Sequence, residues 1–226
     1  MVRLALLLVL SLTLTAAQEL ESARDRQDRP AFAAIIAGLS QAALKSPNDA
    51  GAHYRLAVAR SYLAEVDLEL GDKPGARAAA EAGIGDAQRA VALKPKTADY
   101  HRVLGTLCGQ VIPANLLLAL KYGKCASESI NKALELDPKS PEAYLSRGVG
   151  NYYLPATLGG GLEPAIRDFR KALELNPKSA EAQLWLGIAL RKSGRNADAR
   201  AALKKSLELN PNRAWAKQQF DKTPVK

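Results

Sequence analysis

Four nearly identical segments recur along this chain, and each of them ends in a proline. They are AVALKP (90–95), ALELDP (133–138), ALELNP (172–177) and SLELNP (206–211), with a weaker copy, AALKSP, at 42–47. Each segment is typical of the last turns of an amphipathic helix, and the proline ends that helix because it cannot continue it. Short helices of this kind cannot bury their apolar faces alone, so the repeat predicts a stack of helix pairs.

Small residues recur at a fixed place in the helical stretch that precedes each segment. They stand in Leu56-Ala57, Leu104-Gly105, Arg147-Gly148 and Leu186-Gly187. Two antiparallel helices approach closely only where a side chain is nearly absent. We therefore expect Gly187 to face Ala199, and Gly148 to face Ala165.

This pattern resembles the tetratricopeptide repeat (TPR), whose unit has 34 residues. The last unit fits best, because Pro177 and Pro211 are 34 residues apart. The resemblance implies an all-α fold, an α-α superhelical solenoid of about four repeats. We expect a leading half-repeat at 30–45 and a C-terminal capping helix at 212–220.

The repeats differ in length in a graded way. Successive terminal prolines are 48, 43, 39 and 34 residues apart, which is an excess over 34 of 14, 9, 5 and 0. In the first pair the extra residues are helix-forming, so both helices should grow by about two turns, at 3.6 residues per turn. In the second pair Pro113 predicts a break, and in the third pair YYLPATLGGGLEP predicts a loop.

The N-terminus has the layout of a secretory signal peptide. Arg3 precedes an apolar run from Leu4 to Leu14, which is too short to span a bilayer, and small residues up to Ala17 form a cleavage site. We therefore expect an exported protein, periplasmic or secreted; an uncleaved anchor is the alternative. The domain prediction is a signal peptide at 1–17, a linker at 18–29, the TPR array at 30–221 and a tail at 222–226.

Positive charge is concentrated at the C-terminal end. The chain carries a net charge of +9, and residues 191–226 hold ten Lys and Arg against three Asp and Glu. A basic end favours an acidic partner or an anionic surface, and the alternative is a solvated face that keeps the protein soluble. Nucleic acid is not expected, because no aromatic side chains are interleaved for base stacking.

No stretch after the N-terminal apolar run is apolar enough for stable membrane insertion.

No combination of residues predicts catalysis, a metal site or a cofactor. His53 and His101 occupy equivalent places in two repeats, and no cysteine or paired carboxylates accompany them. The glycines of 158–161 could hold an anion at a helix start, but the strand and lysine of a phosphate loop are missing, so a simple turn is the expectation. The chain is not expected to be an enzyme.

The two cysteines fall on opposite helices of one pair. Gly105 should face Ala126 across this pair, which places Cys108 within a turn of Cys125. An exported protein meets oxidising conditions, so a disulfide is one expectation, and two buried thiols are the other.

The TPR resemblance also implies a binding surface, because partners usually contact the first helix of each pair on the concave face. The corresponding residues of this chain are Tyr54, Tyr62, Arg102, Gln110, Tyr152, Tyr153, Arg191 and Lys192. Tyrosine offers flat area with a polar tip, and arginine offers a planar fork for carboxylates. Such a groove suits an extended peptide with acidic residues or a free C-terminus. The alternative is that half of these side chains pack between helices, as we expect for Tyr144 and Trp185.

Two functions follow from the resemblance. The first is an exported scaffold or adaptor that binds a protein or peptide. The second is a periplasmic solute-binding protein similar to the T component of TRAP transporters, which would need an enclosed apolar pocket. The stretch GTLCGQV (105–111) and the long insertions are also similar to the regulator-of-microtubule-dynamics family, although a signal peptide argues against transferring that family's role. The sequence predicts neither the partner nor the oligomeric state.

Overall fold

All secondary structure in the described part of the chain is helical. A computed structural model describes residues 17–225, apart from the side chain of Leu116, so the predicted signal peptide lies almost entirely outside it. The α-helices that follow a first helical segment at 17–25 are α2 (Arg29–Lys45), α3 (Ala50–Glu69), α4 (Lys73–Leu93), α5 (Ala98–Val111), α6 (Ala119–Leu136), α7 (Pro141–Tyr153), α8 (Leu162–Leu175), α9 (Ala180–Lys192), α10 (Asn196–Leu209) and α11 (Ala214–Asp221). This is the all-α solenoid predicted from the repeat.

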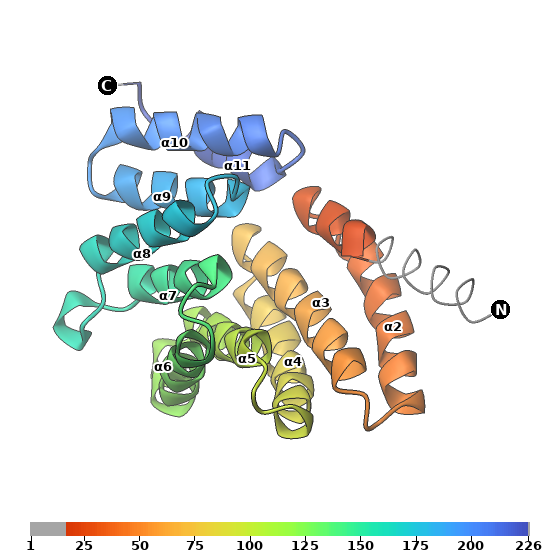
Figure 1. Ribbon diagram of the computed structural model, residues 1–226. Helices are drawn as coiled ribbons and strands as arrows, with labels where there is room; N and C mark the ends of the chain where they lie inside the picture. Colours follow the sequence, from red (N-terminus) through yellow and green to blue (C-terminus); the bar gives the residue numbers. More distant parts are fainter. Residues whose placement is uncertain (1–16, 226) are drawn as a thin grey trace.

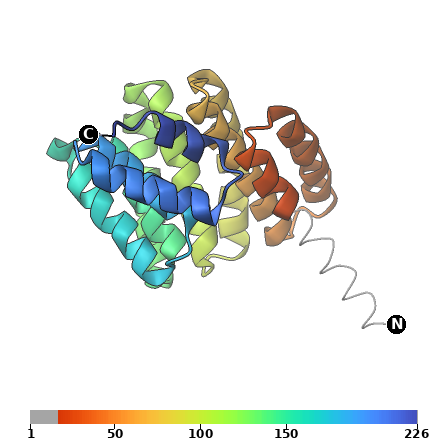
Figure 2. The ribbon, with the colours of Figure 1, turned by 90° about the horizontal axis from the view of Figure 1, so that it is seen from above.

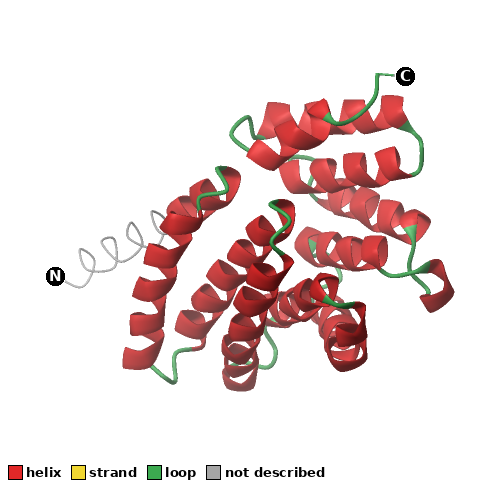
Figure 3. Ribbon diagram, turned by 180° about the vertical axis from the view of Figure 1, so that it is seen from behind, coloured by secondary structure: helices red, strands yellow, loops and turns green. Residues whose placement is uncertain are grey.

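The helices are arranged as antiparallel pairs that follow a curved path (Figures 1 and 3). The pairs are α3 with α4, α5 with α6, α7 with α8, and α9 with α10, and α11 packs on the last pair. Viewed from above, the blue turn before α11 reaches the orange-red helices of the N-terminus (Figure 2). The two ends of the array therefore meet.

The pairs differ in height, as the proline spacing predicts. Helices α3 and α4 have 20 and 21 residues, whereas α9 and α10 have 13 and 14. Each helix of the first pair is thus about two turns longer than its counterpart in the last pair. Both long helices begin at aspartate caps: the carboxylate of Asp49 accepts from the amide of Gly51, and that of Asp72 accepts from the amide of Gly75.

The other insertions form the connections within the second and third pairs. Two short 3₁₀ turns, η1 (Ile112–Ala114) and η2 (Leu116–Leu118), join α5 to α6. A third turn, η3 (Ala156–Leu158), precedes the glycines that lead into α8.

Those glycines turn the chain. The amides of Gly159, Gly160 and Gly161 donate to backbone carbonyl oxygens at 3.0, 3.2 and 2.8 Å. Gly159 and Gly161 also have positive φ angles of 86° and 108°, which favour glycine. The amides of these three glycines are therefore not free to bind an anion.

Small residues allow close approach within the pairs. A Cβ on Gly187 would lie 3.1 Å from the carbonyl oxygen of Ala199, which agrees with the predicted contact. For Gly148 the nearest atoms belong to Phe169 rather than to Ala165. A Cβ on Gly148 would lie 2.5 Å from Cε1 of Phe169, because this fully buried ring, one turn further along α8, occupies the space beside the glycine.

The segment predicted as a linker is part of the packed array. Residues 17–25 are helical, and Leu20 and Ala23 are buried against Phe32 of α2 and Val66 of α3. The prediction of a linker at 18–29 is therefore wrong, because charged residues dominate its sequence while its two apolar side chains form the contact. No helix within residues 17–225 is long and apolar enough to cross a membrane.

Candidate binding surface

The eight residues predicted to line the groove lie, two each, on the first helices of the four pairs. Tyr54 and Tyr62 are on α3, and Arg102 and Gln110 are on α5. The C-terminal half contributes Tyr152 and Tyr153 from α7, and Arg191 and Lys192 from α9. Their neighbours in adjacent repeats decide which of them a partner can reach.

Asp99 of α5 binds two of these side chains. Its carboxylate accepts a hydrogen bond from the Tyr54 hydroxyl and pairs with the Arg102 guanidinium. Burial alone would raise the pKa of Asp99, but Arg102 and the Tyr54 hydroxyl bring it below the usual value. Burial, followed by the charge of Asp99, raises the pKa of Tyr54, which stays protonated. The Tyr54–Asp99 bond thus joins α3 to α5, while Arg102 is paired within α5.

The remaining two residues of this half are also occupied. The Gln110 amide donates to the Ser61 carbonyl oxygen at 3.0 Å and accepts from the Ser61 hydroxyl at 3.0 Å. The guanidinium of Arg24 lies 4.8 Å from the centre of the Tyr62 ring and covers it. The N-terminal helical segment therefore lies over part of the predicted groove.

The C-terminal half is more open. Arg191 donates to the carbonyl and side-chain oxygens of Gln219 at 3.0 and 2.6 Å, so it anchors α11. Tyr153, in contrast, is 51% exposed, and Lys192 is exposed with its ammonium 4.3 Å from the ring centre of Tyr152.

Trp185 packs against the two tyrosines of this half. Its ring centre lies 5.7 Å from that of Tyr152 and 6.2 Å from that of Tyr153, while the residue itself is only 8% exposed. The predicted packing of Trp185 between helices is therefore correct. A cation and a tyrosine face remain accessible above it at the C-terminal ends of α7 and α9.

A buried cluster of charges joins the two ends of the array. Arg213, in the turn before α11, is fully buried. Its guanidinium lies 2.8 Å from Oε1 of Glu65 and 2.8 Å from Oε1 of Glu181, and it pairs with Glu69. These partners come from α3 and α9, so one side chain connects three parts of the chain.

The N-terminal helical segment contributes to the same cluster. Nη2 of Arg24 lies 3.4 Å from Asp25 and 3.4 Å from Glu181, and the Arg24 carbonyl oxygen accepts from Arg213 at 3.4 Å. We call this set the ionic clasp; it consists of Arg24, Asp25, Glu65, Glu69, Glu181 and Arg213. Two further bonds flank it, from the Asn210 amide to Asp25 at 2.7 Å and from the Gln218 amide to Gln27 at 3.0 Å.

The pKa values of the carboxyl groups in the clasp shift in different directions. Burial raises the pKa of Glu65 to about 7, and it also raises the pKa of Glu69, in each case against the opposing effect of Arg213. For Glu181, burial would raise the pKa as well, but Arg24 and Arg213 together bring it below its usual value. The carboxyl groups of the clasp therefore differ in proton affinity.

The sequence did not predict the clasp, although one signal pointed toward its position. Glu65 and Glu69 lie in the two additional turns of α3 that the proline spacing predicts. Arg213 stands in the NRAW segment, which indicates only a capping helix.

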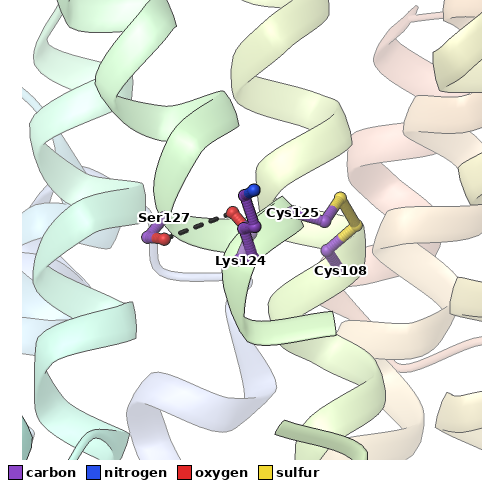
Figure 4. The surroundings of a disulfide bond; sticks show 4 residues. All are labelled: Cys108, Lys124, Cys125 and Ser127. Carbon is purple, nitrogen blue, oxygen red and sulfur yellow. Dashed lines mark hydrogen bonds between the residues drawn. A yellow bond between two sulfur atoms is a disulfide. The ribbon is translucent and has the colours of Figure 1, made fainter. Parts of the chain in front are cut away.

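Cys108 and Cys125 form a disulfide between α5 and α6, with Cα atoms 6.0 Å apart (Figure 4). This is the first of the two expectations for the cysteines. Cys108 is buried beside Leu107 and Val111, so the bond joins the two helices within the core.

The two histidines share one kind of contact. Nε2 of His53 lies 3.2 Å from the carbonyl oxygen of Pro47, and Nε2 of His101 lies 2.8 Å from that of Pro95. Each ring therefore contacts the turn six residues before it. Among residues 17–225, no group of three or more His, Cys, Asp or Glu side chains is placed to hold a metal ion.

Comparison with known proteins identifies the class first. A family model described as Tetratricopeptide repeat matches residues 160–214. A solved TPR protein from Thermus thermophilus, TTC0263, is 21% identical with a TM-score of 0.64, and the match covers 91% of this chain and 97% of that one. The HusA haemophore of Porphyromonas gingivalis is 19% identical with a TM-score of 0.59, covering 88% and 92%. The fold is that of a TPR solenoid.

A second family model covers most of the remaining chain. The model described as Regulator of microtubule dynamics protein 1-3 matches residues 13–159, well over half of the sequence. The chain belongs to this family. A search of the curated proteins found no match.

Proposed function

We propose that this protein is an exported scaffold that binds another protein or a peptide on the concave face of its helix array and catalyses no reaction. The observation that carries the proposal is the exposed pair of Tyr153 and Lys192. Lys192 packs on the ring of Tyr152, and both tyrosines pack on Trp185. Aromatic side chains with large, rigid contact areas dominate the energetics of protein interfaces.

The lining of this open half favours a partner segment with a carboxylate. The Lys192 ammonium can pair with it, while the faces of Tyr152 and Tyr153 accept flat or apolar side chains. The concentration of basic residues in 191–226 would also speed the approach of an acidic partner. Arg102, in contrast, is already paired with Asp99 and is not expected to contribute directly.

Affinity capture from the native host tests this surface. Tyr153→Ala and Lys192→Ala should each reduce the recovery of a bound protein, because neither side chain is buried and neither change should unfold the array. Lys204→Ala, an exposed lysine on α10, is the matched control and should leave recovery unchanged. Equal recovery with all three variants would show that the partner binds elsewhere.

A solute-binding role, similar to the T component of TRAP transporters, is the alternative. It calls for an enclosed apolar pocket, and two cavities of the described residues, of about 310 and 320 Å³, include none of the eight predicted groove residues. The role in the family's name, regulation of microtubules, is tested separately by co-sedimentation with polymerised tubulin.

Export is part of the proposal, supported by the charged and apolar pattern of residues 1–17. N-terminal sequencing of the mature protein from the native host tests it, and a mature chain that begins near Gln18 is expected. Retention of Met1 would contradict cleavage.

A further inference from the structure

The ionic clasp is a direct contact between the two ends of the array. Arg213 is separated from Glu65 by 148 residues and from Glu69 by 144, and its side chain is fully buried. The clasp therefore joins the N-terminal helical segment, the end of α3, the start of α9 and the turn before α11.

The charges within the clasp do not balance. Four carboxyl groups, from Asp25, Glu65, Glu69 and Glu181, surround only two guanidinium groups, those of Arg24 and Arg213. A buried site with an excess of two negative charges is costly, because desolvation and mutual repulsion both act against the ionised carboxylates. Binding one proton relieves part of this cost.

We propose that the ionic clasp is a proton-controlled latch. With a proton on Glu65 it holds the first and last helices of the array together, and with all four carboxylates ionised it releases the N-terminal helical segment from α3 and α9. Release uncovers the ring of Tyr62, over which Arg24 lies in the closed protein. This proposal concerns the shape of the protein itself and goes beyond the proposed binding role.

Several elements contribute the groups that decide the proton affinity of Glu65. The charged and titratable side chains that act on it or on its immediate neighbours are Arg24, Asp25, Tyr62, Glu69, Tyr153, Glu181 and Arg213. Only the two arginines favour its ionised form, whereas the carboxylates and burial oppose it. Glu65 therefore binds the proton more tightly in the closed protein than it would in water.

The direction of the pH dependence follows from this difference. The pKa of Glu65 is about 7 in the closed protein, against 4.5 for an exposed glutamate. Between these two values the closed form holds a proton that the open form has lost, so closure weakens as the pH rises from 4.5 to 7 and is weakest above 7. Glu181 acts in the opposite sense: its pKa is lowered, so its contribution is lost as the pH falls below 4.5. The latch is tightest in mildly acidic solution.

Hydrogen exchange measured by mass spectrometry tests the latch directly. Protection of residues 17–27, corrected for the intrinsic exchange rate at each pH, should fall about thirtyfold between pH 5.5 and 8.5, the change expected for one proton with these two pKa values. Helix α8, which contributes no residue to the clasp, serves as the internal reference and should keep its protection.

Two matched variants separate the latch from general loosening. Glu65→Gln imitates the protonated side chain, so its protection at 17–27 should stay at the acidic level across the whole pH range. Glu174→Gln removes an exposed carboxylate that pairs with Lys171 on α8, and it should keep the full thirtyfold response.

Corrected protection that does not change between pH 5.5 and 8.5 in the unaltered protein would overturn the proposal. So would a Glu65→Gln variant that keeps the same pH response. Because the measurement needs no partner, its outcome is independent of whether Tyr153 and Lys192 bind one.

Discussion

Two glycines in helix α7 allow a direct test of close helix packing. Gly148 and Gly150 are two residues apart, yet their surroundings differ. A Cβ on Gly148 would lie 2.5 Å from Cε1 and 2.7 Å from Cδ1 of Phe169, whereas a Cβ on Gly150 would meet no atom within 4 Å. Phe169 is fully buried and its ring centre lies 6.2 Å from that of Trp185, so it has little room to move aside.

The two alanine substitutions should therefore change stability in opposite directions. Replacing a helical glycine by alanine favours the helix by about 0.5–1 kcal/mol, and Gly150→Ala should gain this amount. In Gly148→Ala the same gain is opposed by an overpacking cost of about 1–3 kcal/mol. We expect a net loss of roughly 0.5–2 kcal/mol for Gly148→Ala, and thus a difference of roughly 1–3 kcal/mol between the variants.

Urea unfolding followed by circular dichroism at 222 nm measures this difference, with the same slope assumed for both variants. Tryptophan fluorescence provides a second signal from this end of the array, since Trp185 packs on Phe169 and Trp215 packs on Trp185. If Gly148→Ala were as stable as Gly150→Ala, the close approach of α7 and α8 would not depend on the missing side chain, and the reasoning about small residues in the repeat would fail.

Two further perturbations test other contacts. Arg213→Met should lower the free energy of unfolding by about 3–5 kcal/mol, because it leaves buried carboxylates without their partner. The control Arg195→Met, at an exposed pair with Asp198, should lower it by less than about 1 kcal/mol. Equal losses for the two variants in denaturant unfolding would contradict a stabilising clasp. Removing the disulfide, whose cysteines are 17 residues apart, should cost about 3 kcal/mol. Denaturant unfolding with and without reductant measures this cost, and the Cys108→Ala/Cys125→Ala variant, as the control, should not respond to reductant. An unfolding midpoint of the native protein that does not change on reduction would contradict the predicted stabilisation.

The helix pairs could be predicted from sequence because their signals are local. Proline at the end of a helix and a small residue at a fixed distance before it act within one repeat. The same reasoning predicted the additional turns of α3 and α4, since an excess of helix-forming residues between the two helices of one pair must lengthen both helices. It did not predict that the ring of Phe169 would be the nearest neighbour of Gly148.

The accessibility of the groove could not be predicted in the same way. Repeat register places Tyr54 and Arg102 on first helices, but it does not show that Asp99 binds both. Tyr62 is covered by a segment that the sequence assigned to a linker. Contacts between repeats, and between the two ends of the chain, depend on the curvature of the whole array, which no single repeat specifies.

The irregular height of the array explains how its ends come to be joined. Helices α7 and α9 have 13 residues, and an α3 of that length, beginning at Ala50, would end at Tyr62. Glu65 and Glu69 exist only because α3 continues for two more turns, and without them Arg213 would lose two of its carboxylate partners. A regular array would therefore leave a buried arginine poorly compensated at the turn before α11. The excess length of the first pair thus has a definite structural consequence: the added turns of α3 place Glu65 and Glu69 beside Arg213 in the turn before α11.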